Sequence, residues 1–400
     1  MEYYIIIAAS VVIILSYLFN RVAEKSSIPS VLLLIILGIA LRELLVLIDI
    51  DKASILEIID RIQLLELLGT LGLILIVLEA ALELKIELGK LALIGKSLLI
   101  ALVGLLSCVF ATGFVFRIFF PLMEWPTALV YATPLSILSS AIVIPSVMSL
   151  PKEEEEFHIY ESTFSDILGI MLFYFLLQLN EPSTTSMMVV GDFTFNLFIT
   201  ITTSILLSYL LIYLFQKLET KVKLFLMISV LLLLFCIGKL LHLSSLLVIL
   251  IFGLILSNNR LFFFGRLKKY LRPIAIDSIK DSFLLITIES AFVIRTFFFV
   301  IFGFSIAISS LYDVQVAITS GLVLVIIYLS RFLSLAAFRQ PHLKRALLIA
   351  PRGLITLLLF YSIPEEFKFE GFSSGILLFV IIISSLLMTT GLLKKDTISS

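Results

Sequence analysis

The sequence predicts an all-α polytopic membrane protein with about thirteen transmembrane helices. Of its 400 residues, 60% are hydrophobic and only 14% are charged, and the mean hydropathy is +1.18. A soluble domain is nearer to half apolar and a quarter charged. The apolar runs are also long enough to cross a bilayer, which takes about 20 residues each. The formal net charge is zero, so nothing indicates a nucleic-acid partner.

Polar breaks divide the chain into thirteen apolar runs. The first lacks a basic n-region and a small-residue cleavage pattern, so we interpret it as a retained span and not as a signal peptide. We expect residues 1–400 to form a single membrane unit. The predicted spans are 3–20, 28–48, 62–83, 92–118, 126–149, 158–179, 192–216, 222–241, 243–258, 282–310, 313–335, 344–361 and 371–393.

Basic residues indicate how these spans are oriented. Nineteen Lys and Arg residues follow odd-numbered spans, whereas only four follow even-numbered spans: Lys52, Arg61, Arg117 and Lys368. Cytoplasmic loops carry an excess of Lys and Arg. We therefore expect the N-terminus outside and the C-terminus in the cytoplasm, in a plasma membrane (the inner membrane of a bacterium).

Thirteen spans also divide into six, one and six. Many transporters consist of two inverted repeats, in which a linking helix sets the relative topology. Residues 1–179 then form the first repeat, 192–216 the connecting helix and 222–393 the second repeat. This arrangement makes the fifth span the counterpart of the twelfth.

The fifth and twelfth spans are both interrupted. The fifth reads YATPLSILSSAIVIPSV and the twelfth reads ALLIAPRGLITLLLFY. Proline removes a helix donor, and non-helical backbone at membrane depth survives only inside protein or beside a cavity. Two ordinary proline kinks are the alternative, but a matched pair of broken helices favours a binding site near the middle of the membrane. The residues expected at the two breaks are Pro134, Ser139, Ser140, Pro351 and Gly353.

The sixth span carries carboxylates where charge is costly. In YESTFSD, Glu161 and Ser165 are four residues apart, as are Ser162 and Asp166, so each pair shares a helix face. Asp166 lies about two turns into the span, before a wholly apolar stretch. A carboxylate in that setting can hold a proton or a hard cation, but not both well, and such competition is sufficient for exchange. The alternative is an Asp that only joins helices by hydrogen bonds.

Other charges in the spans are expected to form structural ion pairs. Glu289 and Arg295 are six residues apart and lie on different faces of the tenth span, and Arg352 lies in the twelfth. Arginine is always charged, so each must reach a carboxylate or backbone carbonyl groups. Glu161 and Glu289 are the available carboxylates, and we expect Glu161 to pair with Arg352.

The layout of nearly the whole chain resembles the monovalent cation:proton antiporter superfamily, specifically the NhaP/NHE-type sodium/proton exchangers. Five segments carry the resemblance: LEAALEL (Leu78–Leu84), TPLSILSSAIVIP (Thr133–Pro145), ESTFSD (Glu161–Asp166), RTFFFVIFG (Arg295–Gly303) and APRGLIT (Ala350–Thr356).

The resemblance implies an NhaA-like antiporter fold with two broken crossing helices, a homodimer and elevator-like movement. It implies that Asp166 binds Na⁺ or a proton, helped by Ser162, by Thr133 and by Glu79 through water. It implies no cofactor. The activity would be exchange of Na⁺ or Li⁺ for protons.

Two positions depart from the family pattern. Ser165 stands where the family has Asn, and we expect this shorter side chain to be less able to bridge to a neighbouring helix. Thr133 stands where an Asp often precedes Pro134, which leaves the preferred cation open. Electrogenic relatives carry Asp-Asp at the site, so the lone Asp166 favours electroneutral exchange.

Alternative functions also remain. A potassium/proton antiporter or channel-like relative usually has a cytoplasmic nucleotide-binding domain, and a sodium-coupled organic-anion symporter would need more polar residues in the twelfth span. An intramembrane enzyme is disfavoured, because no HExxH or GxSxG motif is present. A structural or sensor protein would not account for broken helices beside buried charges.

Overall fold

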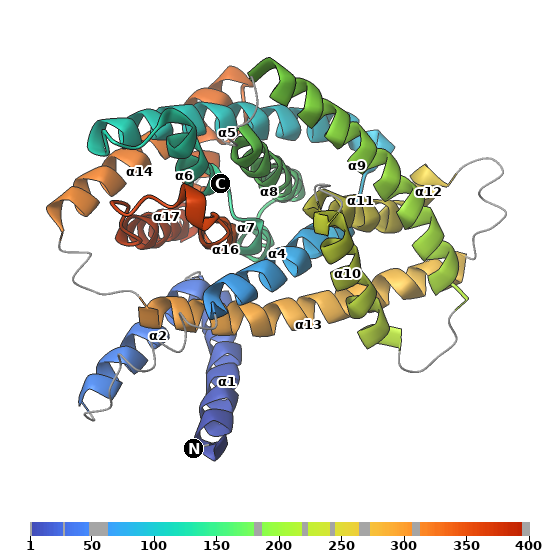
Figure 1. Ribbon diagram of the computed structural model, residues 1–400, viewed down its shortest axis with the longest axis horizontal. Coiled ribbons are helices and arrows are strands. Elements are labelled where there is room, and N and C mark those ends of the chain that lie inside the picture. The colour runs from blue at the N-terminus through green and yellow to red at the C-terminus, as the bar shows by residue number, and fades with distance from the viewer. Residues whose placement is uncertain are drawn as a thin grey trace, which may run out of the picture. The chain divides into compact units, whose positions relative to one another are not determined.

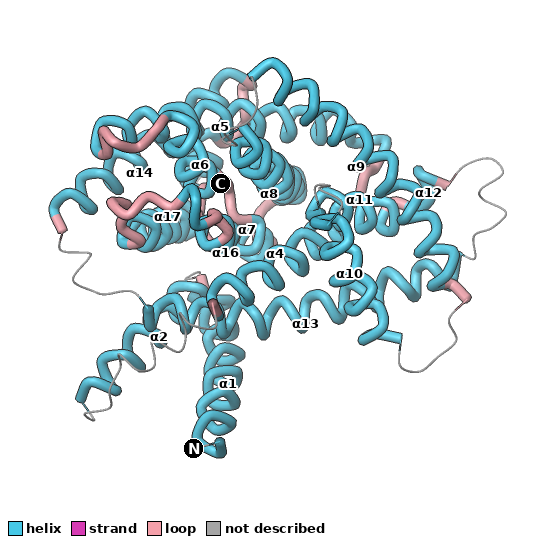
Figure 2. The backbone as a smooth tube through the Cα atoms, in the orientation of Figure 1, coloured by secondary structure: helices cyan, strands magenta, loops and turns pink. Residues whose placement is uncertain are grey.

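The structure is helical wherever it is described. The computed structural model describes residues 2–26, 29–47, 63–179, 186–217, 223–240, 245–263, 273–305 and 313–393. Within these residues every regular element is a helix and none is a strand (Figures 1 and 2). The predicted all-α class is confirmed.

The chain forms two compact units. The first comprises Met1–Thr70, Ala92–Phe173 and Val293–Ser400. Its helices are α1 (Glu2–Ser26), α2 (Ser30–Leu47), α5 (Leu91–Phe119), α6 (Trp125–Ser136), α7 (Ser140–Val147), α14 (Val314–Ala337), α15 (Leu343–Leu348), α16 (Leu354–Tyr361), the 3₁₀ helix η4 (Glu365–Phe367) and α17 (Gly375–Leu393). In this unit α6 packs against α16, and α17 packs against α14 and α15.

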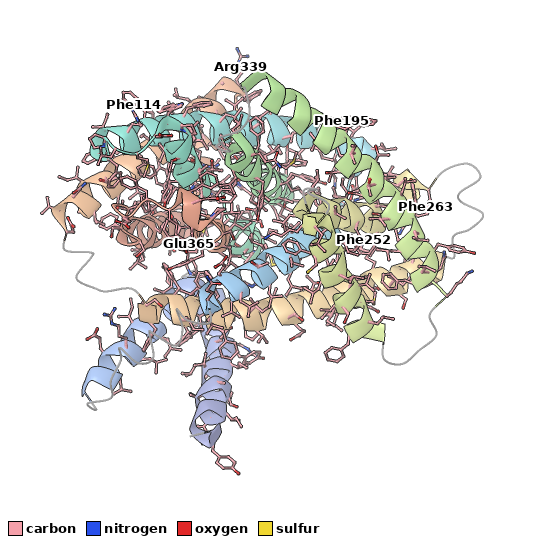
Figure 3. All side chains as sticks on the ribbon, in the orientation of Figure 1. Phe114, Phe195, Phe252, Phe263, Arg339 and Glu365 are labelled. Carbon is pink, nitrogen blue, oxygen red and sulfur yellow. The ribbon has the colours of Figure 1, made fainter. Side chains whose placement is uncertain are left out.

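The second unit comprises Leu71–Leu91 and Tyr174–Phe292. Its helices are η1 (Leu88–Lys90), α9 (Ser186–Phe215), α10 (Lys223–Leu240), α11 (Ser245–Ser257) and α12 (Asn259–Phe262). The buried helix α11 packs against α9 and α10. Phe252 on α11, labelled in Figure 3, meets the ring of Phe283 edge to face, and the ring centroids are 5.3 Å apart.

Three helices are divided between the units: α4 (Leu64–Glu83), α8 (Lys152–Leu179) and α13 (Pro273–Ser305). The first residue of α5, Leu91, also belongs to the second unit. Each unit therefore draws on both predicted repeats. The repeat boundaries, which concern internal symmetry and not contacts, stay a prediction.

Nine of the described helices are long enough and apolar enough to cross a membrane, and two more, Phe225–Leu240 and Ser245–Ser257, are apolar but shorter. The count of thirteen crossings stays a prediction. Large apolar side chains are exposed in each unit: Phe114 on α5 is 60% exposed and Phe195 on α9 is 66% exposed (Figure 3). Such side chains are suited to contact with lipid.

The helices α2 and α13 cross with their backbones in contact. A Cβ atom added to Gly38 would lie 2.1 Å from the carbonyl oxygen of Val300, and one added to Gly303 would lie 2.3 Å from that of Ile35. Only glycine permits this approach, which is typical of membrane helices that pack without a hydrophobic driving force.

Both predicted interruptions are present. The fifth predicted span consists of α6 and α7, separated by residues 137–139, and the twelfth consists of α15 and α16, separated by residues 349–353. Pro351 and Ser139 lie in the breaks, and Gly353 precedes α16. Pro134 instead lies within the last turn of α6, and Ser140 is the first residue of α7. The first break is thus a short extended segment beyond the proline, and not the proline itself.

Candidate ion-binding site at the helix breaks

The two interrupted helices meet at their breaks in the first unit. The N–H of Ser139 donates to the carbonyl oxygen of Pro351 at 3.1 Å. A Cβ atom added to Gly353 would lie 2.6 Å from Cδ1 of Ile142 and 2.9 Å from Oγ of Ser139. The two breaks are therefore in direct backbone contact, and a side chain at position 353 would separate them.

Helix α8 supplies partners for the first break. The N–H of Leu138 donates to Oγ of Ser165 at 3.0 Å, and the N–H of Ser140 donates to Oδ2 of Asp166 at 3.3 Å. Helix starts leave such N–H groups without partners in the helix, and a carboxylate also complements the positive end of the helix dipole. The expectation that Ser165 bridges poorly is wrong, because α8 lies close enough for its short side chain to reach the break.

The second break contributes a positively charged side chain, that of Arg352. The side chain of Arg352 donates from Nε to the carbonyl oxygen of Leu135 at 2.7 Å and from Nη1 to that of Ala350 at 3.4 Å. Its own N–H donates to Oγ of Ser384 at 3.0 Å. The two carbonyl groups lie at the C-terminal ends of α6 and α15, where a positive charge is favourable. Arg352 thus takes the second option expected for it, which was backbone carbonyl groups.

One oxygen of Asp166 is left open. Asp166 is 2% exposed, and its Oδ1 has no hydrogen-bond partner among the described residues. The same holds for the buried Oγ of Ser139 in the break. A buried oxygen without a partner loses the free energy of its hydration, so a proton or a cation bound there would be stabilised.

Two hydroxyl groups expected at the site are buried and orientated by their own helices. Oγ1 of Thr133 donates to the carbonyl oxygen of Leu129, and Oγ of Ser162 donates to that of His158, each at 2.8 Å. Since a hydroxyl has one hydrogen, both oxygens retain only lone pairs for other partners. Such oxygens are suitable ligands for a small cation.

Glu161 pairs with Arg331. Nη1 and Nη2 of Arg331 donate to the two carboxylate oxygens of Glu161 at 2.8 and 3.0 Å, and Nε donates to the carbonyl oxygen of Ala346 at 2.8 Å. The expected pair of Glu161 with Arg352 is wrong. Arg331 presents its planar fork to both carboxylate oxygens at once, the strong geometry for such a pair. Nδ1 of His158 is 3.5 Å from the same carboxylate.

Three expected site residues lie elsewhere in the two units. Glu79 is half-buried on the part of α4 that belongs to the second unit, and Glu289 is exposed on the part of α13 in that unit. Arg295 is half-buried on the part of α13 in the first unit. Their roles stay predictions.

Two broken helices that meet at their breaks, beside a buried carboxylate and a buried arginine, indicate a secondary membrane transporter. The chain belongs to the sodium/hydrogen exchanger family, whose transmembrane model matches residues 7–395. The expected family is confirmed. The chain is accordingly a multi-pass membrane protein of a cation/proton antiporter family.

Solved structures show the same fold. The sodium proton antiporter MjNhaP1 from Methanocaldococcus jannaschii, in a structure at pH 8, is 21% identical with a TM-score of 0.67, over 98% of this chain and 96% of that chain. A second structure of MjNhaP1, from an electron-microscopy map, gives 21% identity and a TM-score of 0.63 over 98% and 94% of the two chains. Comparison with curated proteins gives no match. The predicted antiporter fold is confirmed.

Proposed function

We propose that the protein exchanges Na⁺ or Li⁺ for protons across the plasma membrane, with Asp166 binding the cation and the proton in turn. The observation that carries this proposal is the unequal setting of the two carboxylate oxygens. Oδ2 accepts from the N–H of Ser140 in the first break, whereas Oδ1 is buried without a described partner. The carboxylate is thus held in place by one oxygen and can bind an ion through the other.

The exchange follows from competition for that one oxygen. A proton and a cation both bind Oδ1, so each displaces the other. The site has the same net charge with either ligand, whereas the empty carboxylate is negatively charged. Moving a buried unpaired charge is costly, so only the two loaded forms pass between the two sides of the membrane. One cation is then exchanged for one proton without net charge transfer.

The oxygens around the break supply the remaining cation ligands. Oγ of Ser139 is buried and open, and the hydroxyl oxygens of Thr133 and Ser162 offer lone pairs. Ser165 holds the break in place through Leu138. Glu79, on the part of α4 that belongs to the second unit, remains a predicted second acidic group of the transport pathway. Hard cations such as Na⁺ and Li⁺ prefer oxygen ligands of this kind.

The remaining charges hold the fold and do not carry ions in this proposal. The pair of Glu161 with Arg331 and the guanidinium of Arg352 fix the helices around the site. Glu289 and Arg295 are each expected to form structural ion pairs elsewhere on α13. The protein works as a homodimer by alternating access, with its N-terminus outside and its C-terminus in the cytoplasm. The distribution of Lys and Arg between the loops supports this orientation.

The test uses everted vesicles that contain a pH-sensitive dye. Addition of Na⁺ or Li⁺ is expected to dissipate the pH gradient with the native protein and to have no effect with Asp166→Asn, which keeps the shape but cannot be ionised. The matched control is Asp277→Asn, an exposed Asp of the second unit, which is expected to behave as the native protein.

Three results would contradict parts of the proposal. Equal signals from the native protein and Asp166→Asn would exclude Asp166 as the carrier. A response to K⁺ alone would indicate a potassium/proton antiporter. In proteoliposomes, the ion gradient at which transport reverses its direction can be measured at several membrane voltages. If that gradient depends on the voltage, electroneutral exchange is excluded.

A further inference from the structure

A small, partly open cavity lies in the first unit beside the pair of Glu161 and Arg331. The volume open to the centre of a water-sized sphere is about 20 Å³. A cavity needs about 10–15 Å³, measured in this way, to hold one water molecule. The cavity therefore has room for one small ligand of about the size of water. Its walls come from α5, α6, α8, α14 and both helix breaks.

The charged groups of the wall disfavour a cation. One carboxylate and two guanidinium groups line the cavity, from Glu161, Arg331 and Arg352, and all three residues are at most 5% exposed. The wall thus carries a net charge of +1. A buried Na⁺ would meet this charge in a medium of low dielectric constant, where repulsion is strong.

Three of the four serine hydroxyl groups of the wall disfavour an anion, and the fourth, Ser165, accepts from the N–H of Leu138. Three serines of the lining each donate to a carbonyl group of their own helix, at 2.9, 3.1 and 2.9 Å: Ser136, Ser330 and Ser334. A hydroxyl has a single hydrogen, so these oxygens offer only lone pairs to the cavity. The carboxylate of Glu161 also only accepts. A halide needs donors and would be repelled by these acceptors.

A wall that mixes fixed donors and fixed acceptors suits a molecule that does both. We infer that one water molecule binds in this cavity, accepting a hydrogen bond from the guanidinium of Arg352 and donating one to the carboxylate of Glu161. The water joins the second break to α8, the helix that holds the first break. This site is independent of which cation the protein transports.

Gly104 keeps the cavity open. It lines the cavity from α5, and a Cβ atom added to it would lie 3.3 Å from Oγ and 3.8 Å from Cβ of Ser334. A methyl group therefore fits with a small adjustment and takes the place of the water. Gly95 on the same helix is a matched control, since an added Cβ there meets no atom within 4 Å.

The test is a crystal structure of the full-length protein at a resolution that shows ordered water. The crystals are grown in NaBr. The native protein is expected to show one density peak with at least two polar neighbours at about 2.7–3.2 Å. The peak is expected to have no bromide anomalous signal and to be absent in Gly104→Ala. The melting temperature of Gly104→Ala is expected to lie below that of Gly95→Ala, since both gain helix propensity but only the first loses the water.

Three results would overturn the inference. They are an empty cavity in the native map, an anomalous bromide peak in the cavity, and a peak that persists unchanged in Gly104→Ala. If Gly104→Ala does not fold, the native map and the bromide signal decide the question without it.

Discussion

The two helix breaks bind groups of opposite charge, the carboxylate of Asp166 at the first and the guanidinium of Arg352 at the second. The first break takes its partners from α8, where Ser165 and Asp166 accept from backbone N–H groups. The second break carries its own partner, because Arg352 donates to carbonyl groups at the ends of α6 and α15. Each charge complements the helix ends that face it.

The difference lies in what the two charges can do. The guanidinium of Arg352 stays protonated and cannot release its charge. The carboxylate of Asp166 can bind a proton or a cation and so can become neutral. The second break is therefore a fixed support, and the first break is where the site changes its charge. Three substitutions test this difference between the two breaks, and they are given in order of decreasing expected effect on stability.

Arg352→Met is expected to have the largest effect. It removes the donors to two buried carbonyl groups, Leu135 and Ala350, at a cost of about 2–5 kcal/mol in the free energy of unfolding. The melting temperature should fall and vesicle transport should be lost. The exposed Arg339, labelled in Figure 3, gives the control Arg339→Met, which should change neither. A native-like melting curve for Arg352→Met would refute the supporting role.

Gly353→Ala is expected to force the two breaks apart. Its methyl group would overlap Cδ1 of Ile142, and such overpacking costs about 1–3 kcal/mol. Ile142→Val removes that atom, so the double variant should recover part of the loss in a double-mutant cycle followed by thermal unfolding.

Gly321→Ala on α14 is the control for Gly353→Ala, since a Cβ there meets no atom within 4 Å. If Ile142→Val gave no recovery, the contact between the breaks would not be the cause of the loss.

Ser165→Ala is expected to have the smallest effect of the three. It leaves the N–H of Leu138 without its acceptor, at a cost of about 1–2 kcal/mol. Because Asp166 still holds Ser140, cation-driven transport should persist with a weaker apparent affinity for Na⁺. Ser107→Ala, whose exposed hydroxyl bonds only to its own helix, is the matched control. Complete loss of transport by a stable Ser165→Ala would assign this serine a direct role in ion binding.

The sequence was sufficient to predict the all-α class, both breaks and an acid inside the sixth span, Asp166, because each depends on local composition. Apolar runs, prolines among serines and an acid in a span are visible without knowledge of contacts. Arg331 was also accessible, since it is a charge inside the predicted span 313–335, and the rule that identified Arg352 applies to it equally. It was nevertheless missed.

The partners of these residues could not be predicted, because they depend on how helices far apart in the chain are rotated and packed. Nothing in the spacing of Glu161 indicates that α14, and not the second break, faces it. The contact of Ser165 with Leu138 likewise requires a close approach of α8 that side-chain length alone does not reveal. The division into two contact units, which cuts through α4, α8 and α13, has the same origin.

The long separation between the two breaks has a consequence for biosynthesis. Leu135 precedes Arg352 by 217 residues, so the first break is inserted well before its partner exists. At ribosomal speeds of about 5–20 residues per second, the interval is roughly 10–40 s. During that time the end of α6 lacks its cation, and its carbonyl groups must be satisfied by water or by insertion factors. A chain that stalls in this interval is expected to be a substrate for membrane proteases.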